Sequence, residues 1–506
     1  MNNHKLSPWS LFQESYDKYR DRTMLIYNDI EFTYADMFHE VQAFAQLIEK
    51  WSFTMGGVFL PNCNQWIASM LAMNKQKKAF VSLSYQFKGE ALIELINYTD
   101  IELLVTDAKG FEAMHASLDS LNIRVVLVLQ PSGSYEIHEF QDKAPREING
   151  ITEDTFGICF TSGSTSRPKG IVLSNRAITG NALAIAEHLN FTSEDRTIIP
   201  RSLAQASPLA GDVLMAISRG GSIILLNNLF HPAIFLRAIH DYKATQFYIV
   251  RTMLLQVLEY PQRHNYDISS LKRVLIGGMV NSLAIYRDAA ATMPSAKIYN
   301  AYGTSEAVAR VSFGEHDEVT KLSCVIGKPI KGCQITVYRE DGTEAAIGET
   351  GELYIQSDYV MDGYYKSEHL TGEVLTSRGI RVRDTGYQDK NGLFYVLSRN
   401  DDMIMQGGSR VYPIDIEEVL LKHDGVKEVV ALGIDDDKLG QKVIAFVCLK
   451  DGVQLQVKEL YRWCISQLED RKVPKEIYIV DMIPRNVIGK INKNEVKALY
   501  HHLVSV

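Results

Sequence analysis

Short apolar runs alternate with longer amphipathic stretches through most of the chain. The amphipathic stretches near 66–76 and 90–98 have the spacing of helices. Because strands that alternate with helices form parallel sheets covered by helices, the pattern predicts a large α/β body with more than one sheet. The apolar runs that predict its strands lie at 58–60, 79–83, 103–105, 222–226, 246–250 and 273–276.

The pattern changes towards the C-terminus. Short strands punctuated by glycine predict a β subdomain over about 335–399. A polar break at Asn400-Asp401-Asp402 follows, and the tail beyond it alternates helix, two strands and helix. The predicted fold class is therefore α/β. It has a large N-terminal domain at 1–399, with parallel sheets, flanking helices and the β subdomain, and a small mobile α+β C-terminal domain at 400–506.

Length and composition narrow the protein class. With 506 residues, the chain exceeds a single ordinary core. The 46% of hydrophobic residues is typical of a globular protein, and the net charge of −8 gives no reason to expect nucleic acid. The start lacks the apolar core of a signal peptide, and no run approaches the roughly 18 apolar residues of a membrane helix. Because the six cysteines include no Cys-x-x-Cys pair, we expect a cytoplasmic protein with neither a disulfide framework nor a zinc site.

The segment Thr161-Ser162-Gly163-Ser164-Thr165-Ser166-Arg167-Pro168-Lys169-Gly170 has the composition of a phosphate-binding loop. Glycine lets backbone N–H groups approach phosphate oxygens, hydroxyls add donors, and the lysine supplies positive charge. Apolar runs on both sides predict that the loop joins two strands, and Ser174 is expected to cap a helix that ends near His188. A Walker loop instead opens a helix and carries Ser or Thr after its lysine. A P-loop NTPase is therefore disfavoured, while a plain surface turn stays possible for such a composition alone.

The order of these residues resembles the signature loop of the adenylate-forming superfamily. This superfamily includes acyl- and aryl-CoA ligases, the adenylation domains of peptide synthetases, and luciferases. Ser166 stands where the family usually has glycine, which costs backbone freedom but removes no donor. The resemblance implies ATP as a substrate. The residues that it assigns to the phosphates are Thr161, Ser162, Gly163, Ser164, Thr165 and Lys169.

A second motif covers 300–306, after the predicted strand 297–299, and is expected to open a helix. Tyr302 offers a ring face for a purine, Thr304 a hydroxyl for the α-phosphate, and Glu306 a hard oxygen ligand for Mg²⁺. The alternative is a helix capping box, which the Thr-x-Glu spacing does not fit. The motif resembles the Tyr-Gly-x-Thr-Glu motif of the superfamily. The further nucleotide-pocket residues that the resemblance assigns are Gly278, Asn300, Ala301 and Gly303.

A third motif surrounds Asp384, which resembles the first Asp of the family pattern Thr-Gly-Asp-x-Gly-x-x-Asp. Gly386 and Asp389 fall in the same register, although Val382-Arg383 replaces the usual Thr-Gly. The resemblance implies that Asp384 accepts both ribose hydroxyls and that Arg399 lies near the same sugar. Taken alone, Asp384 also fits an Asx cap at a tight turn.

Three sequence features predict functional residues in the small domain. Asp401 matches the residue at which the family's small domain pivots, although a solvated linker acid is equally consistent with it. Gly407 and Gly408 resemble a stretch that lines the pantetheine channel of CoA ligases, and otherwise fit a hairpin. Lys490, in the family's final motif, is the predicted catalytic lysine. Its ammonium would bridge the attacking carboxylate and the α-phosphate.

The resemblance implies a two-step ligase. A small carboxylic acid reacts with Mg·ATP to give an acyl-adenylate and pyrophosphate, and a thiol then attacks the adenylate. The thiol belongs either to CoA or to the phosphopantetheine of an acyl carrier protein, and the motifs do not separate these two acceptors. A nucleotide-binding module that has lost catalysis is a third alternative, which the intact Glu306, Asp384 and Lys490 disfavour.

The acid itself is not determined by the sequence. Arg201 and Arg251 stand where the family commonly has other residues, and they predict either an acid with a polar or second carboxylate group or plain surface salt bridges. Asp212 is the only acidic anchor near 204–212, which argues against an α-amino acid.

Overall fold

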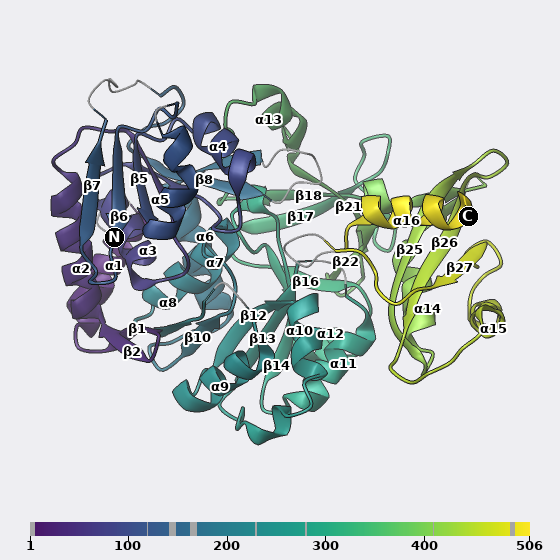
Figure 1. Cartoon of the computed structure of the whole chain (residues 1–506). Coiled ribbons are helices and arrows are strands. Elements are labelled where there is room, and N and C mark those ends of the chain that lie inside the picture. The colour runs from purple at the N-terminus through teal and green to yellow at the C-terminus, as the bar shows by residue number, and fades with distance from the viewer. Residues whose placement is uncertain are drawn as a thin grey trace.

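The computed structural model has a large body and a small C-terminal domain (Figure 1). The small domain, drawn in yellow-green, lies to the right of the purple, teal and green body. The predicted α/β class, with a large N-terminal domain and a small C-terminal one, is confirmed. The structure describes residues 6–118, 120–140, 148–161, 169–227, 230–278, 281–407, 409–485 and 491–505.

The first sheet has eight strands and is parallel at its centre, as expected where strands and helices alternate. Their spatial order is β19 (Gly363–Tyr364), β9 (Lys169–Ser174), β8 (Thr155–Thr161), β4 (Ala79–Ser82), β3 (Met55–Phe59), β5 (Leu103–Asp107), β6 (Val125–Leu129) and β7 (Tyr135–Glu139). Strands β8 and β9 are antiparallel neighbours, so the predicted phosphate loop does join two strands.

The second sheet has fourteen strands and is half parallel and half antiparallel. Its parallel half is β14 (Lys297–Tyr302), β13 (Arg273–Gly277), β12 (Gln246–Val250), β10 (Arg196–Ile199), β11 (Ser222–Leu225) and β1 (Thr23–Tyr27), with β2 (Ile30–Thr33) at the edge. Its antiparallel half is β15 (Ser312–Gly314), β16 (Val325–Pro329), β22 (Phe394–Arg399), β21 (Gly379–Gln388), β18 (Gly351–Ser357) and β17 (Cys333–Tyr338), with β20 (Leu375–Thr376) beside β21. The strands of the predicted β subdomain therefore continue the parallel sheet, through the pairing of β16 with β22.

Helices cover both faces of the two sheets. Between the sheets, α1 (Pro8–Tyr19), α2 (Tyr34–Ile48), α3 (Asn64–Lys75) and α6 (Asn175–His188) share one core with strands of both. Outside the first sheet lie α4 (Gly89–Tyr98) and α5 (Ala108–Met114), and outside the second lie α9 (Pro232–Tyr242), α10 (Arg251–Leu258) and α11 (Leu283–Thr292). Shorter helices are α7 (Ala206–Pro208), the π-helix η2 (Leu209–Leu214), α8 (Met215–Ile217), α12 (His316–Val319) and α13 (Glu368–Val374).

The predicted cap of α6 is confirmed, since the Ser174 side chain accepts a hydrogen bond from the Ala177 backbone N–H at 3.2 Å. This bond satisfies one of the free donors at the start of the helix and fixes where β9 ends. In the part of the chain that the structure describes, no helix combines the length and the apolar character that crossing a membrane requires.

The small domain has a sheet of its own with helices on both faces. Apolar side chains of α14 (Pro413–Leu421) and α15 (Val457–Gln467) pack on one face, and those of α16 (Lys493–Ser505) pack on the other. The strand order is β24 (Ser409–Val411), β23 (Ile404–Gln406), β26 (Gly440–Leu449) and β25 (Val426–Asp436), with β27 (Glu476–Ile479) beside β26. Lys427 of this domain forms an ion pair with Glu259 of the large body at 3.2 Å.

A buried carboxylate ties strands of the second sheet together. Asp195, whose side chain is 1% exposed, accepts hydrogen bonds from Arg273 at 3.0 Å and from Lys272 at 2.9 Å. Burial raises the pKa of Asp195, but the hydrogen bond from Lys272 and the charge of Arg273 outweigh it, so the pKa lies below its ordinary value. The stability that Asp195 contributes is therefore present above about pH 4 and is lost as the pH falls through the folded-state pKa.

Replacing Arg273 and Lys272 one at a time should show how much a buried and an exposed ion pair to Asp195 each contribute to the free energy of unfolding. The Arg273 side chain is 9% exposed and that of Lys272 is 54% exposed. We expect Arg273→Met to cost about 3 kcal/mol, because it leaves a buried charge short of its partner. The matched Lys272→Met should cost about 1 kcal/mol or less, because an exposed ion pair is screened. Urea denaturation at neutral pH measures both, and equal losses would contradict the assignment of Asp195 as a buried anchor.

Candidate active site

One cavity of about 900 Å³ opens at the carboxyl ends of the parallel strands β10, β12, β13 and β14. Ligands of α/β sheets commonly bind at this edge. Small-domain residues Lys427, Glu428 and Arg485 also line it, so both domains enclose the space. The predicted site residues that line it are Lys169, Gly278, Asn300, Ala301, Tyr302, Gly303, Thr304, Glu306, Asp384 and Arg399.

Of the other predicted site residues, the structure describes Gly407 and the backbones of Thr161 and Asp401, and the rest lie outside the described residues. Gly407, at φ 58°, lies in the turn between β23 and β24 and is not among the described residues that line the cavity. Asp401 lies in a 3₁₀ turn, η5 (Asn400–Asp402), directly after β22. Those outside the described residues are Ser162, Gly163, Ser164, Thr165, Gly408 and Lys490, together with the side chains of Thr161 and Asp401.

The prediction that the motif at 300–306 opens a helix is wrong. Strand β14 continues to Tyr302, and a single 3₁₀ turn, η4 (Ser305–Ala307), follows before the chain reverses into β15. Val308 then adopts φ 69° and ψ −67°, a positive-φ conformation that a right-handed helix cannot continue. The fold is tight here, because a Cβ atom on residue 303 would lie 1.9 Å from the Ala309 carbonyl oxygen. Gly303 is thus required by close backbone packing.

Glu306 is held from two sides. Thr304 Oγ1 donates a hydrogen bond to one carboxylate oxygen, and the Tyr364 hydroxyl donates to the other. Burial raises the pKa of Tyr364, so its hydroxyl remains a donor. The Lys169 ammonium lies 5.5 Å from the centre of the Tyr364 ring. Sequence analysis missed Tyr364, because it reaches the site through the long-range pairing of β19 with β9.

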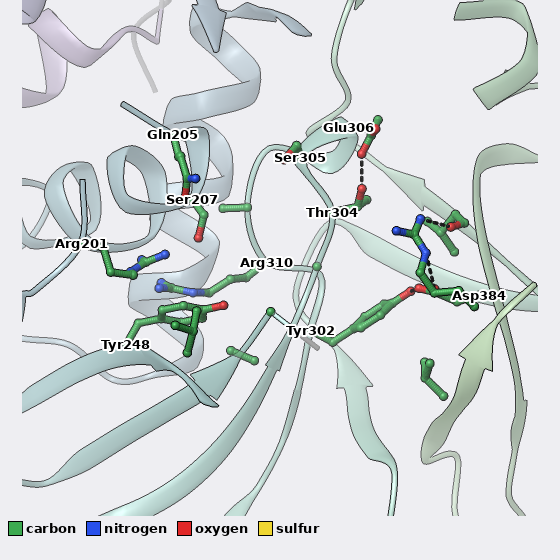
Figure 2. Close-up of a pocket in the computed structure, with 18 of the residues that line it drawn as sticks. Arg201, Gln205, Ser207, Tyr248, Tyr302, Thr304, Ser305, Glu306, Arg310 and Asp384 are labelled. Carbon is green, nitrogen blue, oxygen red and sulfur yellow. Dashed lines mark hydrogen bonds and ion pairs between the residues drawn. The ribbon is translucent and has the colours of Figure 1, made fainter. Parts of the chain in front are cut away.

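Asp384 lies at the other side of the predicted nucleotide pocket. It is paired across β21 and β22 with Arg399, whose Nε lies 3.6 Å from Asp384 Oδ1. The Tyr302 hydroxyl donates a 2.6 Å hydrogen bond to Asp384 Oδ2 (Figure 2). Burial raises the pKa values of both Asp384 and Tyr302. The carboxylate and the ring expected to bind sugar and base are therefore neighbours.

Glu306 and Thr304 could hold a metal ion. They bring a carboxylate and a hydroxyl together on the cavity wall, and Mg²⁺ prefers such hard oxygen ligands. Proteins usually bind Mg²⁺ through one or two carboxylates, with substrate phosphates and water completing the shell. The residues present fit that pattern.

The alternative that Arg201 and Arg251 form plain surface salt bridges is wrong for both residues, because both side chains are buried. Arg201 is 8% exposed and forms an ion pair with Asp212 at 2.7 Å. Arg310, 1% exposed and not singled out by its sequence, pairs with the same carboxylate at 3.1 Å. The guanidinium carbons of Arg201 and Arg310 lie 4.0 and 4.8 Å from the centre of the Tyr248 ring. Asp212, the acidic anchor considered for an α-amino group within 204–212, is thus occupied by two guanidinium groups.

Arg251 has a different place. It begins α10, is 4% exposed, and is not among the described residues that line the cavity. Its charge interacts with Glu417 and Glu428 of the small domain, while burial lowers its pKa. Arg251 therefore belongs to the contact between the domains and not to the wall of the cavity.

Comparison with known proteins identifies the family. The profile of the family described as AMP-binding enzyme matches residues 12–365, and that of the AMP-binding enzyme C-terminal domain matches 415–490. Curated relatives include the feruloyl-CoA synthase of an Amycolatopsis species, 27% identical over 86% of this chain and 87% of that protein. Another is the 2-succinylbenzoate–CoA ligase of Bacillus pumilus, 28% identical over 94% of this chain and 95% of the relative.

Solved structures share the fold. The amide bond synthetase McbA from Marinactinospora thermotolerans superposes with a TM-score of 0.86 at 24% identity, covering 97% of this chain and 99% of its own. The anthranilate CoA ligase AuaEII superposes with a TM-score of 0.88 at 18% identity, covering 99% and 98%. The resemblance drawn from the motifs is confirmed, and so is the expected enzyme class, since the curated relatives are CoA ligases and synthases. The chain belongs to the AMP-binding enzyme family, that is, to the adenylate-forming superfamily.

Proposed function

We propose that this chain activates a carboxylic acid with ATP and transfers the acyl group to the thiol of CoA. The observation that carries the proposal is the single cavity in which Lys169, the Thr304–Glu306 pair and the Tyr302–Asp384 pair face one space. We assign Lys169 to the phosphates, the Thr304–Glu306 pair to the metal ion and the Tyr302–Asp384 pair to the nucleoside. Relatives that are named CoA ligases support CoA as the acceptor.

In the first step, a carboxylate oxygen of the acid attacks the α-phosphorus of ATP. An oxygen–phosphorus bond forms, the bond to pyrophosphate breaks, and an acyl-adenylate results. Both reactants are anions, so positive charge must offset their repulsion. Lys169 supplies one such charge at the cavity wall, and Lys490 is proposed to supply the second between carboxylate and α-phosphate.

Mg²⁺ is proposed to bind at Glu306, with Thr304 beside it. When bound, it would neutralise charge on the phosphates. The hydroxyl of Tyr364 keeps the Glu306 carboxylate oriented. Thr304, which donates to Glu306 in the structure, is proposed to donate to an α-phosphate oxygen once it releases Glu306. Asp384 is proposed to accept the ribose hydroxyls beside the ring of Tyr302.

In the second step, the thiolate of CoA attacks the carbonyl carbon of the adenylate, the thioester forms, and AMP leaves. Gly407 lies away from the described cavity wall, so its proposed role beside the pantetheine arm requires the small domain to rotate after adenylation. Asp401, in the turn after β22, is the proposed pivot. A carrier-protein phosphopantetheine as acceptor and a cytoplasmic location stay predictions.

Partial reactions test the proposal. Pyrophosphate exchange into ATP is measured across a panel of carboxylic acids for the wild type and for Lys490→Ala. We expect at least one acid to support exchange, and the variant to lose about 100-fold or more, because a charge that stabilises the transition state is gone. Thioester formation from supplied acyl-adenylate should stay near wild type. Lys497→Ala, at an exposed lysine of α16, is the control and should exchange normally. The proposal would be overturned if no acid of the panel supported exchange, or if Lys490→Ala exchanged as fast as the wild type.

The orientation of Glu306 by Tyr364 gives a second prediction. Tyr364→Phe removes the hydroxyl bonded to Glu306, and the Mg²⁺ concentration that half-saturates exchange should rise about 10-fold or more, as for other groups that orient a metal ligand. The neighbouring Tyr365→Phe instead removes a bond to Asp100 at 2.8 Å, outside the cavity, and should leave the Mg²⁺ requirement unchanged. An equal response of the two variants would show that Tyr364 acts only through stability.

A further inference from the structure

Two buried arginines that line the cavity, Arg201 and Arg310, share the carboxylate of Asp212. Asp212 Oδ2 accepts from Arg201 at 2.7 Å, and Oδ1 accepts from Arg310 at 3.1 Å. Figure 2 shows the two guanidinium groups extended towards each other, beside the ring of Tyr248. All three side chains carry a charge, and all three are at least nine-tenths buried. The cluster Arg201–Asp212–Arg310 therefore has a net charge of about +1 in a largely dehydrated place.

A buried cation without a counter-charge is costly, and buried charges are normally paired. The Nε–H groups of both Arg201 and Arg310 have no hydrogen-bond partner in the described part of the chain. Arg310 additionally donates to the Gly211 carbonyl, and Arg201 donates only to Asp212 among the described contacts. Each guanidinium has five N–H donors, so donors as well as charge are left over.

The local fold is shaped to hold this cluster. Asp212 lies in the π-helix η2, whose wider turn is a recurrent feature of functional sites. A Cβ atom at position 211 would lie 2.1 Å from the Arg310 guanidinium, so Gly211 leaves the space that this side chain fills. Asn181 fixes the backbone of residue 310 by donating to its carbonyl at 2.9 Å. The guanidinium groups are thus positioned before any ligand binds.

The cluster opens on the same space as the proposed reaction centre. Arg201 and Arg310 line the cavity with Thr304 and Glu306, and in Figure 2 they lie to the left of these residues. Arg310 follows Glu306 by four residues, so their Cα atoms are at most about 14 Å apart. The neutral side chains of Gln205 and Ser207 line the cavity beside the cluster.

We infer that this cluster binds a second carboxylate of the substrate, and that the acid is a dicarboxylic acid activated at its other end. The inference rests on the proposed function and names its substrate class. A second carboxylate would neutralise the excess charge and accept from guanidinium N–H groups at the cavity wall, often in the two-bond geometry that guanidinium favours. An acid with an apolar tail would cover these donors without pairing them, and an α-amino group would meet two cations.

Substrate pairs matched in shape test the inference. Pyrophosphate exchange is measured with linear dicarboxylic acids of increasing length, with their monomethyl esters, and with monocarboxylic acids of equal length. We expect the best diacid to exceed its monoester by about 100-fold or more in kcat/KM, because the ester leaves buried donors unpaired. A monocarboxylic acid or monoester as the best substrate would overturn the inference while the ligase stands. No exchange with any acid would instead overturn the proposed function. A phosphonate-bearing acid that outperforms every diacid would overturn the carboxylate assignment.

Variants separate recognition from a structural role. Arg310→Met should reduce the preference for diacid over monoester to about 10-fold or less, since the remaining Arg201–Asp212 pair is neutral. Arg310→Lys keeps the charge and should retain part of the preference. Arg251→Met removes a buried arginine away from the cavity and should retain all of it. If Arg310→Met lowers only the thermal unfolding temperature and leaves the preference intact, the cluster is structural and the inference is wrong.

Discussion

Parallel pairing of β10, β12, β13 and β14 is the constraint on which the site depends. Val250, Gly277 and Ala301 stand side by side across three of these strands, so the segments that follow emerge at one edge of the sheet. Arg201 follows β10 at the same edge. Because strand ends carry no further ladder bonds, their backbone and side chains are free to face a ligand. The position of the cavity is therefore set by hydrogen bonding in the sheet.

Charged and polar side chains from other parts of the fold also line the cavity at this edge of the sheet. Lys169 and Tyr364 come from the first sheet, and Asp384 and Arg399 come from the antiparallel half of the second. The carboxylates of Asp212, Asp384 and Glu306 are each held by a hydrogen bond from a neighbouring side chain, which fixes their direction. A nucleotide and an acid bring negative charge to this space. The arrangement thus favours the meeting of two anions that would repel each other in water.

Local signals predicted much of the fold. Alternating patterns gave the α/β class, and composition gave the loop between two strands and the cap at Ser174, because all of these depend on neighbouring residues. The prediction of a helix after Asn300 was wrong, since the pairing of β14 with β15 that takes its place forms only in the folded chain. Arg310 and Tyr364 were missed for the same reason. An arginine within the apolar run Val308-Ala309-Arg310-Val311 was the one available sign of a buried charge.

In the proposed reaction, a carboxylate attacks the α-phosphorus of ATP in this cavity. This attack is tested with an acid that carries heavy oxygen in its carboxylate, by mass spectrometry of the AMP formed during one turnover with CoA. When the thiol attacks the carbonyl carbon, the oxygen bonded to phosphorus stays with AMP, so one labelled oxygen is expected in the AMP phosphate. Unlabelled AMP, or label in the pyrophosphate, would contradict it.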